Sequence, residues 1–135
     1  MLAQAGALVT SFEEQPLVGL MVQYAKNQLK AIQWQTYVAQ AETVLKQTPT
    51  IWPDILYLDP MFPEKPKGRL PQKRMQILMQ LCDTSDSAAT LLAQAMATPV
   101  TTIVLKQPRK QAAIIPEHHR IIGKSVQWRI YHRSA

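Results

Sequence analysis

The sequence predicts an α/β fold, with a mostly parallel β-sheet covered by helices on both faces and an antiparallel hairpin at one edge. Three observations lead to this class. Segments rich in β-branched and aromatic residues alternate with amphipathic segments along the whole chain. The run "DILYL" at 54–58 is continuously apolar, as in central parallel strands. The segment 119–133 has the pattern of two strands with a turn at 123–125.

The first part of the chain supplies two predicted strand and helix pairs. A short buried strand is expected over 7–13, and Pro16 suits the first turn of the helix that follows. Apolar residues at helical spacing over 17–32 support that helix. The alternation of apolar and polar residues at 32–38 predicts a half-buried strand, and 39–46 predicts a short helix.

Helices and strands also alternate after the central run. A helix is expected to begin near Leu70, and a second helix to run from an N-cap at Ser85 to Ala97. The segment 100–106 is the most β-branched of the predicted strands. An irregular segment bracketed by prolines, 108–116, then leads into the closing hairpin.

Length and composition favour one globular domain. The chain has 135 residues, of which 47% are hydrophobic and 18% charged, and 1–135 is therefore expected to be a single α/β domain. No apolar stretch approaches the roughly 20 residues of a spanning helix. No basic residue precedes Lys26, so the charged start of a signal peptide is missing. A single cysteine, Cys82, rules out an internal disulfide, and a cytoplasmic protein is expected.

The charge of the chain is unevenly placed. The net charge is +6, yet residues 1–63 hold three basic and five acidic side chains, whereas 64–135 hold twelve basic and four acidic ones. Such asymmetry favours a polyanionic partner, and nucleic acid is the commonest one. The alternative is a basic surface that only improves solubility. No metal is expected, because the histidines and the cysteine lack the spacing of a zinc site.

The segment "ILYLDPMFPEKPKGR" at 55–69 carries the clearest candidate site. Asp59 ends a central strand and is restricted by Pro60, and Phe62 is close enough to face the same pocket. A carboxylate that accepts a hydrogen bond from an exocyclic amine, beside a ring that stacks, suits a planar nucleic-acid base. The alternative is a proline-rich loop with Phe62 in the core. Basic residues that would hold phosphates follow: Lys65, Lys67, Arg69, Lys73 and Arg74.

These residues resemble those of a known family. Asp-Pro-Met-Phe-Pro after "ILYL" is similar to the signature of the ribosomal small-subunit methyltransferase J family, a variant of the (Asp/Asn)-Pro-Pro-(Phe/Tyr) motif with Met61 at the second proline. The segments "SFEEQPLV", "VLKQP" and "HRIIGKSVQWRIY" resemble further parts of that family in register. The resemblance implies a Rossmann-like class I methyltransferase that uses S-adenosylmethionine to methylate the N2 amine of a guanine in 16S rRNA.

The resemblance also implies roles for single residues. Asp59, Pro60 and Phe62 would hold the target guanine. Glu13, with Glu14 beside it, would bind the ribose hydroxyls of the cofactor, although the family commonly has Arg at the second position. The other implied contacts are Gln40 and Ala41 with the adenine, Asp59 with the cofactor, Lys106 with the base carbonyl or a phosphate, and Arg109 and Lys110 with the RNA.

One family feature is missing from the sequence. The four glycines, at 6, 19, 68 and 123, form no G-x-G turn of the kind that approaches the cofactor in class I methyltransferases. The resemblance therefore implies a chain without the family's first strand, glycine loop and N-terminal subdomain. Two alternatives stay open: a non-catalytic, basic RNA-binding remnant, and an amino-methyltransferase that acts on another nucleic acid or on protein. The oligomeric state also stays open.

Overall fold

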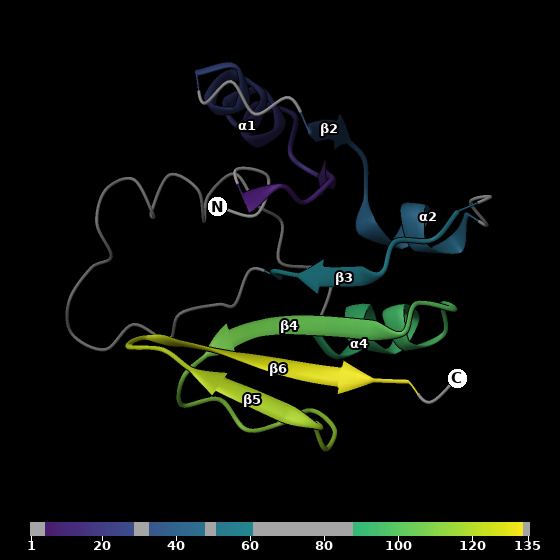
Figure 1. Cartoon of the computed structure of the whole chain (residues 1–135), viewed down its shortest axis with the longest axis vertical. Coiled ribbons are helices and arrows are strands. Elements are labelled where there is room, and N and C mark those ends of the chain that lie inside the picture. Colours follow the sequence, from purple (N-terminus) through teal and green to yellow (C-terminus); the bar gives the residue numbers. More distant parts are fainter. Residues whose placement is uncertain (1–4, 29–32, 48–50, 61–87, 134–135) are drawn as a thin grey trace. The chain divides into compact units, whose positions relative to one another are not determined.

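A computed structural model describes residues 5–28, 33–47, 51–60 and 88–133 (Figure 1). Contacts divide the chain into two compact units, Met1–Gln47 and Thr48–Ala135, and each unit is described by itself. The helix expected to begin near Leu70 and the N-cap at Ser85 lie outside the described residues. The expectation of one domain over 1–135 stays a prediction. No helix in the described ranges combines the length and apolarity needed to cross a membrane.

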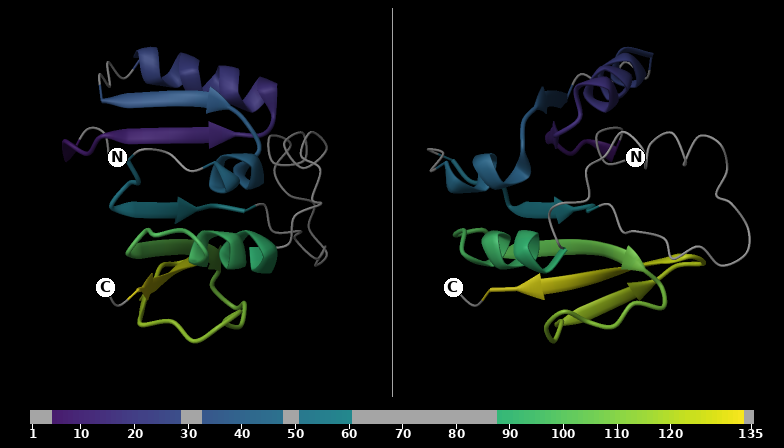
Figure 2. Two further views of the ribbon diagram at one scale, coloured as in Figure 1. Left: turned by 90° about the vertical axis from the view of Figure 1, so that its right-hand side faces the viewer. Right: turned by 180° about the vertical axis from the view of Figure 1, so that it is seen from behind.

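The first unit contains a pair of parallel strands with a helix on one face (Figure 2). Strand β1, Val9–Glu13, pairs in parallel with β2, Trp34–Val38, and helix α1, Pro16–Gln28, connects them and packs against both. Helix α2, Ala41–Lys46, follows β2. At Gly19 of α1, an added Cβ would lie 2.8 Å from Cγ2 of Val38, so the absence of a side chain lets the helix approach the strand closely.

Side chains on the two faces of this strand pair differ in burial. On the face toward α1, the indole Nε1 of Trp34 donates to Oγ of Ser11 at 3.0 Å, and that hydroxyl lies 3.0 Å from Oγ1 of Thr36. On the other face, the rings of Phe12 and Tyr37 stack with centroids 5.7 Å apart, and both side chains are exposed. The half-buried strand predicted at 32–38 is thus confirmed over Trp34–Val38.

The second unit is built on a four-stranded sheet with the order β3-β4-β6-β5 (Figure 1). Strand β3, Ile55–Leu58, is parallel to β4, Thr102–Pro108, which in turn is antiparallel to β6, Val126–His132. Strand β5, His119–Ile122, forms the outer arm of the predicted hairpin and is antiparallel to β6. Helix α4, Ala88–Met96, packs against β3 and β4.

The apolar core of the second unit lies between α4 and one face of the sheet. Strand β4 alternates strictly between half-buried and buried side chains, and its buried ones are Ile103, Leu105 and Gln107. Residues i and i+2 of a strand share a face, so these three point together toward the helix. The remaining buried apolar residues complete this core: Leu58, Leu92, Ala95, Val100 and Tyr131.

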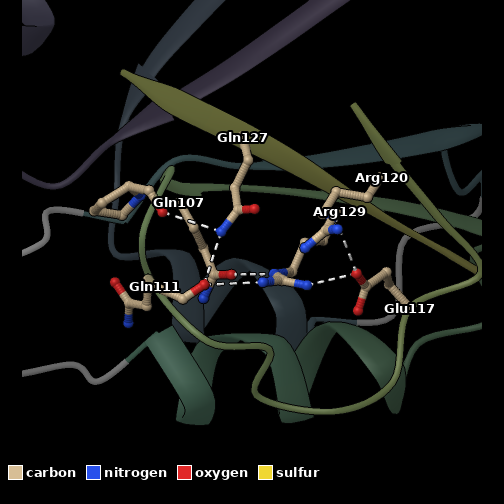
Figure 3. A network of polar contacts seen from close by, with 7 residues as sticks. Gln107, Gln111, Glu117, Arg120, Gln127 and Arg129 are labelled. Carbon is tan, nitrogen blue, oxygen red and sulfur yellow. Dashed lines mark hydrogen bonds and ion pairs between the residues drawn. The ribbon is translucent and has the colours of Figure 1, made fainter. Parts of the chain in front are cut away.

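A buried arginine joins the segment between β4 and β5 to the core face of the sheet (Figure 3). Arg129 of β6 is 3% exposed, and its Nε donates to Oε1 of Gln107 at 2.7 Å. Its Nη1 donates to Oε1 of Glu117 at 2.5 Å, and its Nη2 donates to the carbonyl of Gln111 at 2.9 Å. Gln127 donates to that same carbonyl at 2.8 Å. The guanidinium and the carboxylate of this network therefore have partners, as burial requires. Among the described residues, Nε2 of the buried Gln107 amide has no hydrogen-bond partner.

Several predicted boundaries need correction. The strands expected over 7–13 and 32–38 begin at Val9 and Trp34, where their pairing starts. The strand expected over 100–106 is Thr102–Pro108, because its pairing with β6 continues to Pro108 opposite Val126. Lys106, expected as the last residue of this strand, instead lies inside it, with a cross-strand partner, Trp128. The helix expected over 39–46 begins at Ala41, because the backbone of Gln40 is extended. The α/β class, the parallel pairs and the closing antiparallel hairpin are confirmed.

Candidate active site

The structure brings Asp59 and Lys106 together at the carboxyl end of β3. Leu58 and Leu105 are register partners in parallel strands, so the next residue on each strand reaches the same level. There, Nζ of Lys106 donates to Oδ2 of Asp59 at 2.8 Å. In open α/β sheets, ligands bind outside the carboxyl ends of the strands, and this ion pair occupies such a position.

Both members of the pair can be reached from solvent. The side chain of Asp59 is 50% exposed and that of Lys106 is 33% exposed. Pro60 is half-buried and follows directly, so that it restricts the backbone of Asp59. An acid fixed in place, paired with a cation and open to solvent can accept hydrogen bonds from a ligand without a large desolvation cost. The third predicted member of this site, Phe62, lies outside the described residues.

Two aromatic residues that the sequence analysis did not assign to the site lie on the same face of the sheet. Tyr57 is two residues before Asp59, and Trp128 is the cross-strand partner of Lys106. The indole Nε1 of Trp128 donates to the hydroxyl of Tyr57 at 3.1 Å. Because β4 lies between β3 and β6, this hydrogen bond spans β4. The period of two along β3 placed Tyr57 on the face of Asp59. The position of Trp128 depends on pairing between distant segments.

The proposed cofactor-binding residues of the first unit gather at the carboxyl ends of β1 and β2. Glu13 is the register partner of Val38, and its carbonyl accepts a hydrogen bond from the N–H of Ala39 at 3.0 Å. The next pair also meets, because Nε2 of Gln40 donates to Oε1 of Glu14 at 3.3 Å. Ala41 is the first residue of α2. Three of the four predicted residues therefore belong to one local cluster, with Ala41 directly after it.

The basic residues proposed for RNA contacts are described only in part. Arg109 and Lys110 follow β4 and are exposed, and the N–H of Arg109 donates to the carbonyl of Ser125 at 3.0 Å. Lys106 is engaged with Asp59. The other proposed contacts lie outside the described residues: Lys65, Lys67, Arg69, Lys73 and Arg74.

The three histidines lie closer together than their spacing suggested. The ring of His132 lies edge-on to those of His118 and His119, with centroids 5.8 Å and 5.6 Å away. His132 donates its backbone N–H to Nδ1 of His118 at 3.1 Å. In the described part of the chain, no group of three or more His, Cys, Asp or Glu side chains has an arrangement that could hold a metal ion.

Comparison with known proteins identifies the class of protein. A family model described as "Putative SAM-dependent methyltransferase" matches residues 1–133, and the chain belongs to this family. S-adenosylmethionine is the cofactor in the description of this family. The Asp59 and Lys106 pair at the end of β3 is thus placed in a methyltransferase fold.

The chain is also similar to individual curated proteins. Over 96% of its length, the chain is 30% identical to "Ribosomal RNA small subunit methyltransferase J" of Bdellovibrio bacteriovorus, of which the match covers 54%. The protein of the same name from Legionella pneumophila (strain Lens) is 39% identical over 80 residues, which are 59% of this chain and 33% of that relative. The chain spans between a third and about half of the length of these relatives.

A solved structure agrees with the fold. The chain is similar to the SAM-dependent methyltransferase of Neisseria gonorrhoeae, with a TM-score of 0.64 and 24% sequence identity. The match covers 96% of this chain and 57% of that protein. At this identity the likeness shows the fold, and it confirms the Rossmann-like class I methyltransferase architecture predicted from the sequence.

Proposed function

We propose that this protein takes part in S-adenosylmethionine-dependent methylation of the N2 amine of a guanine in 16S rRNA. The main observation in support is the Asp59 carboxylate at the carboxyl end of β3, whose Oδ2 lies 2.8 Å from Nζ of Lys106 and whose side chain is half-exposed to solvent. The names of the curated relatives support ribosomal RNA of the small subunit as the substrate class. The small ribosomal subunit in the cytoplasm is then the partner.

The reaction depends on the orientation of the guanine amine more than on a strong base. The lone pair of the guanine N2 is delocalised into the ring, so the amine is a poor nucleophile. A hydrogen bond from N2–H to Asp59 orients the amine, and a second one to a backbone carbonyl near Pro60 would complete the orientation. The carboxylate also stabilises the positive charge that develops on N2 and lies close to the proton that N2 loses after methyl transfer. Phe62 is proposed to stack on the base.

The cofactor, when bound, supplies an electrophilic methyl group on a sulfonium. The cluster in the first unit has donors and acceptors that fit its ribose, since carboxylates at Glu13 and Glu14 accept hydrogen bonds from two hydroxyls. The amide of Gln40 already donates to Glu14 and would orient that carboxylate. Ala41, at the start of α2, offers a small side chain beside an adenine.

The proposed test uses small ribosomal subunits lacking the modification, with labelled S-adenosylmethionine and Asp59→Asn. The variant keeps the shape of the side chain but replaces a charged acceptor, so we expect methyl incorporation to fall by about 100-fold or more. Asp54→Asn removes an exposed carboxylate just before the same strand and is the matched control, with incorporation retained. Equal incorporation by Asp59→Asn and the wild type would contradict the assignment of Asp59.

Together with RNA binding and calorimetric titration, the incorporation assay distinguishes a catalytic protein from an RNA-binding remnant. The remnant would bind the RNA with steep salt dependence, yet show neither incorporation nor heat on titration with S-adenosylmethionine. An amino-methyltransferase with another target would instead incorporate label into that other nucleic acid or protein. The rRNA methyltransferase should bind the cofactor and label only the ribosomal RNA.

A further inference from the structure

The side chains of Lys106 and Asp59 form a short row of hydrogen-bonding groups with a fixed order. The ammonium of Lys106 offers only donors, and the ionised carboxylate of Asp59 offers only acceptors. Their contact of 2.8 Å uses one N–H of the lysine and Oδ2 of the aspartate. The row therefore presents a donor followed by two acceptors, and each group keeps capacity for a ligand beyond the contact between them.

This order matches one edge of one base. The Watson–Crick edge of guanine presents the O6 acceptor, then the N1–H donor, then the N2–H donor. A lysine N–H can donate to O6 while the two carboxylate oxygens accept from N1–H and N2–H. Adenine would place its N6 amine against the ammonium and its N1 lone pair against the carboxylate. Two donors would then face each other, and two acceptors would face each other. Uracil would turn its O2 acceptor toward the second carboxylate oxygen.

We propose that Lys106 is a specificity-determining residue that, together with Asp59, selects guanine by binding O6. This inference rests on the proposed function and deepens it, because it explains how a guanine is chosen before its N2 amine is modified. Asp59 alone recognises an amine that adenine and cytosine also carry. The added donor at O6 distinguishes guanine from both.

The surroundings of the pair fit this role better than a role in stability. With side chains 33% and 50% exposed, the two groups are screened by water, and exposed ion pairs add little to the stability of a fold. The stem of Lys106 is flanked by its cross-strand partner Trp128, whose indole is fixed by the hydroxyl of Tyr57 at 3.1 Å. The exposed parts of the ammonium and the carboxylate stay open to a ligand.

The test measures binding of the full chain to short single-stranded RNAs that differ at one central base. The bases are guanine, hypoxanthine, which lacks the N2 amine, 2-aminopurine, which lacks O6 and N1–H, and adenine. The wild type should bind the guanine RNA about tenfold more tightly than each of the others. Lys106→Met should reduce the preference for guanine over 2-aminopurine, and the part that remains comes from N1–H, which Asp59 still distinguishes. The preference for guanine over hypoxanthine should be kept. Lys106→Arg, which keeps a cationic donor, should restore part of the lost preference.

Lys124→Met is the matched control, because it removes the same charge from an exposed residue of the hairpin turn. It should leave all preferences between bases unchanged, and the thermal midpoint of Lys106→Met should equal that of the wild type. If Lys106→Met keeps the full preference for guanine over 2-aminopurine, this proposal is overturned while the role of Asp59 stands. If the wild type binds the four RNAs equally or binds none, both the base selection and the proposed function fall.

Discussion

At the scale of single residues, Arg129 is the least expected feature of the second unit. It stands on the core-facing side of β6 with 3% exposure, between Gln127 and Tyr131, where apolar residues are usual. Its guanidinium is tolerated there because Gln107, Glu117 and the Gln111 carbonyl accept its hydrogen bonds. A buried charge that loses its partner is strongly destabilising, so this network ties the stability of the sheet to the segment that carries Glu117.

The protonation of Glu117 should make that stability depend on pH. A hydrogen bond from its own backbone N–H, followed by the guanidinium of Arg129, lowers the pKa of the Glu117 carboxyl below its ordinary value of 4.5, against the opposing effect of burial. Because the pKa is lowered on folding, the contribution is present above pH 4.5 and is lost as the pH falls through the folded-state value.

Glu117→Gln tests this dependence through urea unfolding between pH 7 and about pH 3. The variant should be less stable than the wild type at neutral pH, and the difference should shrink as the solution is acidified. Since all other carboxyls titrate in both proteins, only the difference between the two curves reports on Glu117. A difference that stays constant across this range would contradict the coupling of Glu117 to Arg129.

At the scale of elements, one face of β4 packs in the core and the other lies on the side of the candidate site. Ile103, Leu105 and Gln107 face the core under α4, whereas Val104 and Lys106 face the side that carries Asp59. The alternation along one strand thus separates the residues that stabilise the unit from those proposed to bind the ligand. Substitutions one residue apart should therefore have different effects.

Leu105→Ala and Val104→Ala form a matched pair for this expectation. Leu105 is fully buried, so its truncation should lower the free energy of unfolding by about 2 to 5 kcal/mol. Val104 is half-buried on the opposite face, and its truncation should cost about 1 kcal/mol. Chemical denaturation of both variants gives the two values. Equal losses would mean that the faces of β4 are not divided in this way.

The sequence predicted most elements of the described fold, because local patterns encode them. Period-two alternation and apolar runs located β1, β2, β3 and the closing hairpin, and Pro16 marked the start of α1. Strand ends were less predictable: pairing with β6 extends β4 to Pro108, and such pairing depends on residues distant in sequence.

The candidate site was predictable to a similar degree. Asp59 was found because an acid follows an apolar strand and precedes a proline. Its contact with Lys106 requires the register of two strands 47 residues apart, which no local pattern contains. The buried Gln107 and Arg129 were missed for a related reason, since polar side chains are usually exposed and only their period-two spacing from Leu105 and Tyr131 signals the core face.

At the scale of the whole molecule, charge is the feature that bears most directly on the proposed partner. The net charge of +6 comes from the later part of the chain, where Arg109 and Lys110 are exposed directly after β4. Lysines and arginines that contact phosphates release counterions on binding, so each contact steepens the dependence of affinity on salt. The number of such contacts is therefore measurable without a structure of the complex.

The double variant Arg109→Ala and Lys110→Ala tests whether these two residues contact RNA. It should weaken binding of single-stranded RNA of any sequence and reduce the slope of log affinity against log salt by about 1.4, which corresponds to two phosphate contacts. Lys26→Ala with Lys46→Ala removes the same charge from the first unit and should leave the slope nearly unchanged. Equal slopes for the wild type and the Arg109 and Lys110 variant would show that the pair makes no phosphate contact.

The register of β3 and β4 has a consequence for how this protein can vary during evolution. Asp59 and Lys106 face each other because the residue that follows β3 and a residue of β4 reach one level of two adjacent parallel strands. Insertions or deletions between the strands would leave the pair in place as long as both strands stay in register. The substrate preference proposed for the pair would then be inherited with the sheet, while the intervening sequence diverges.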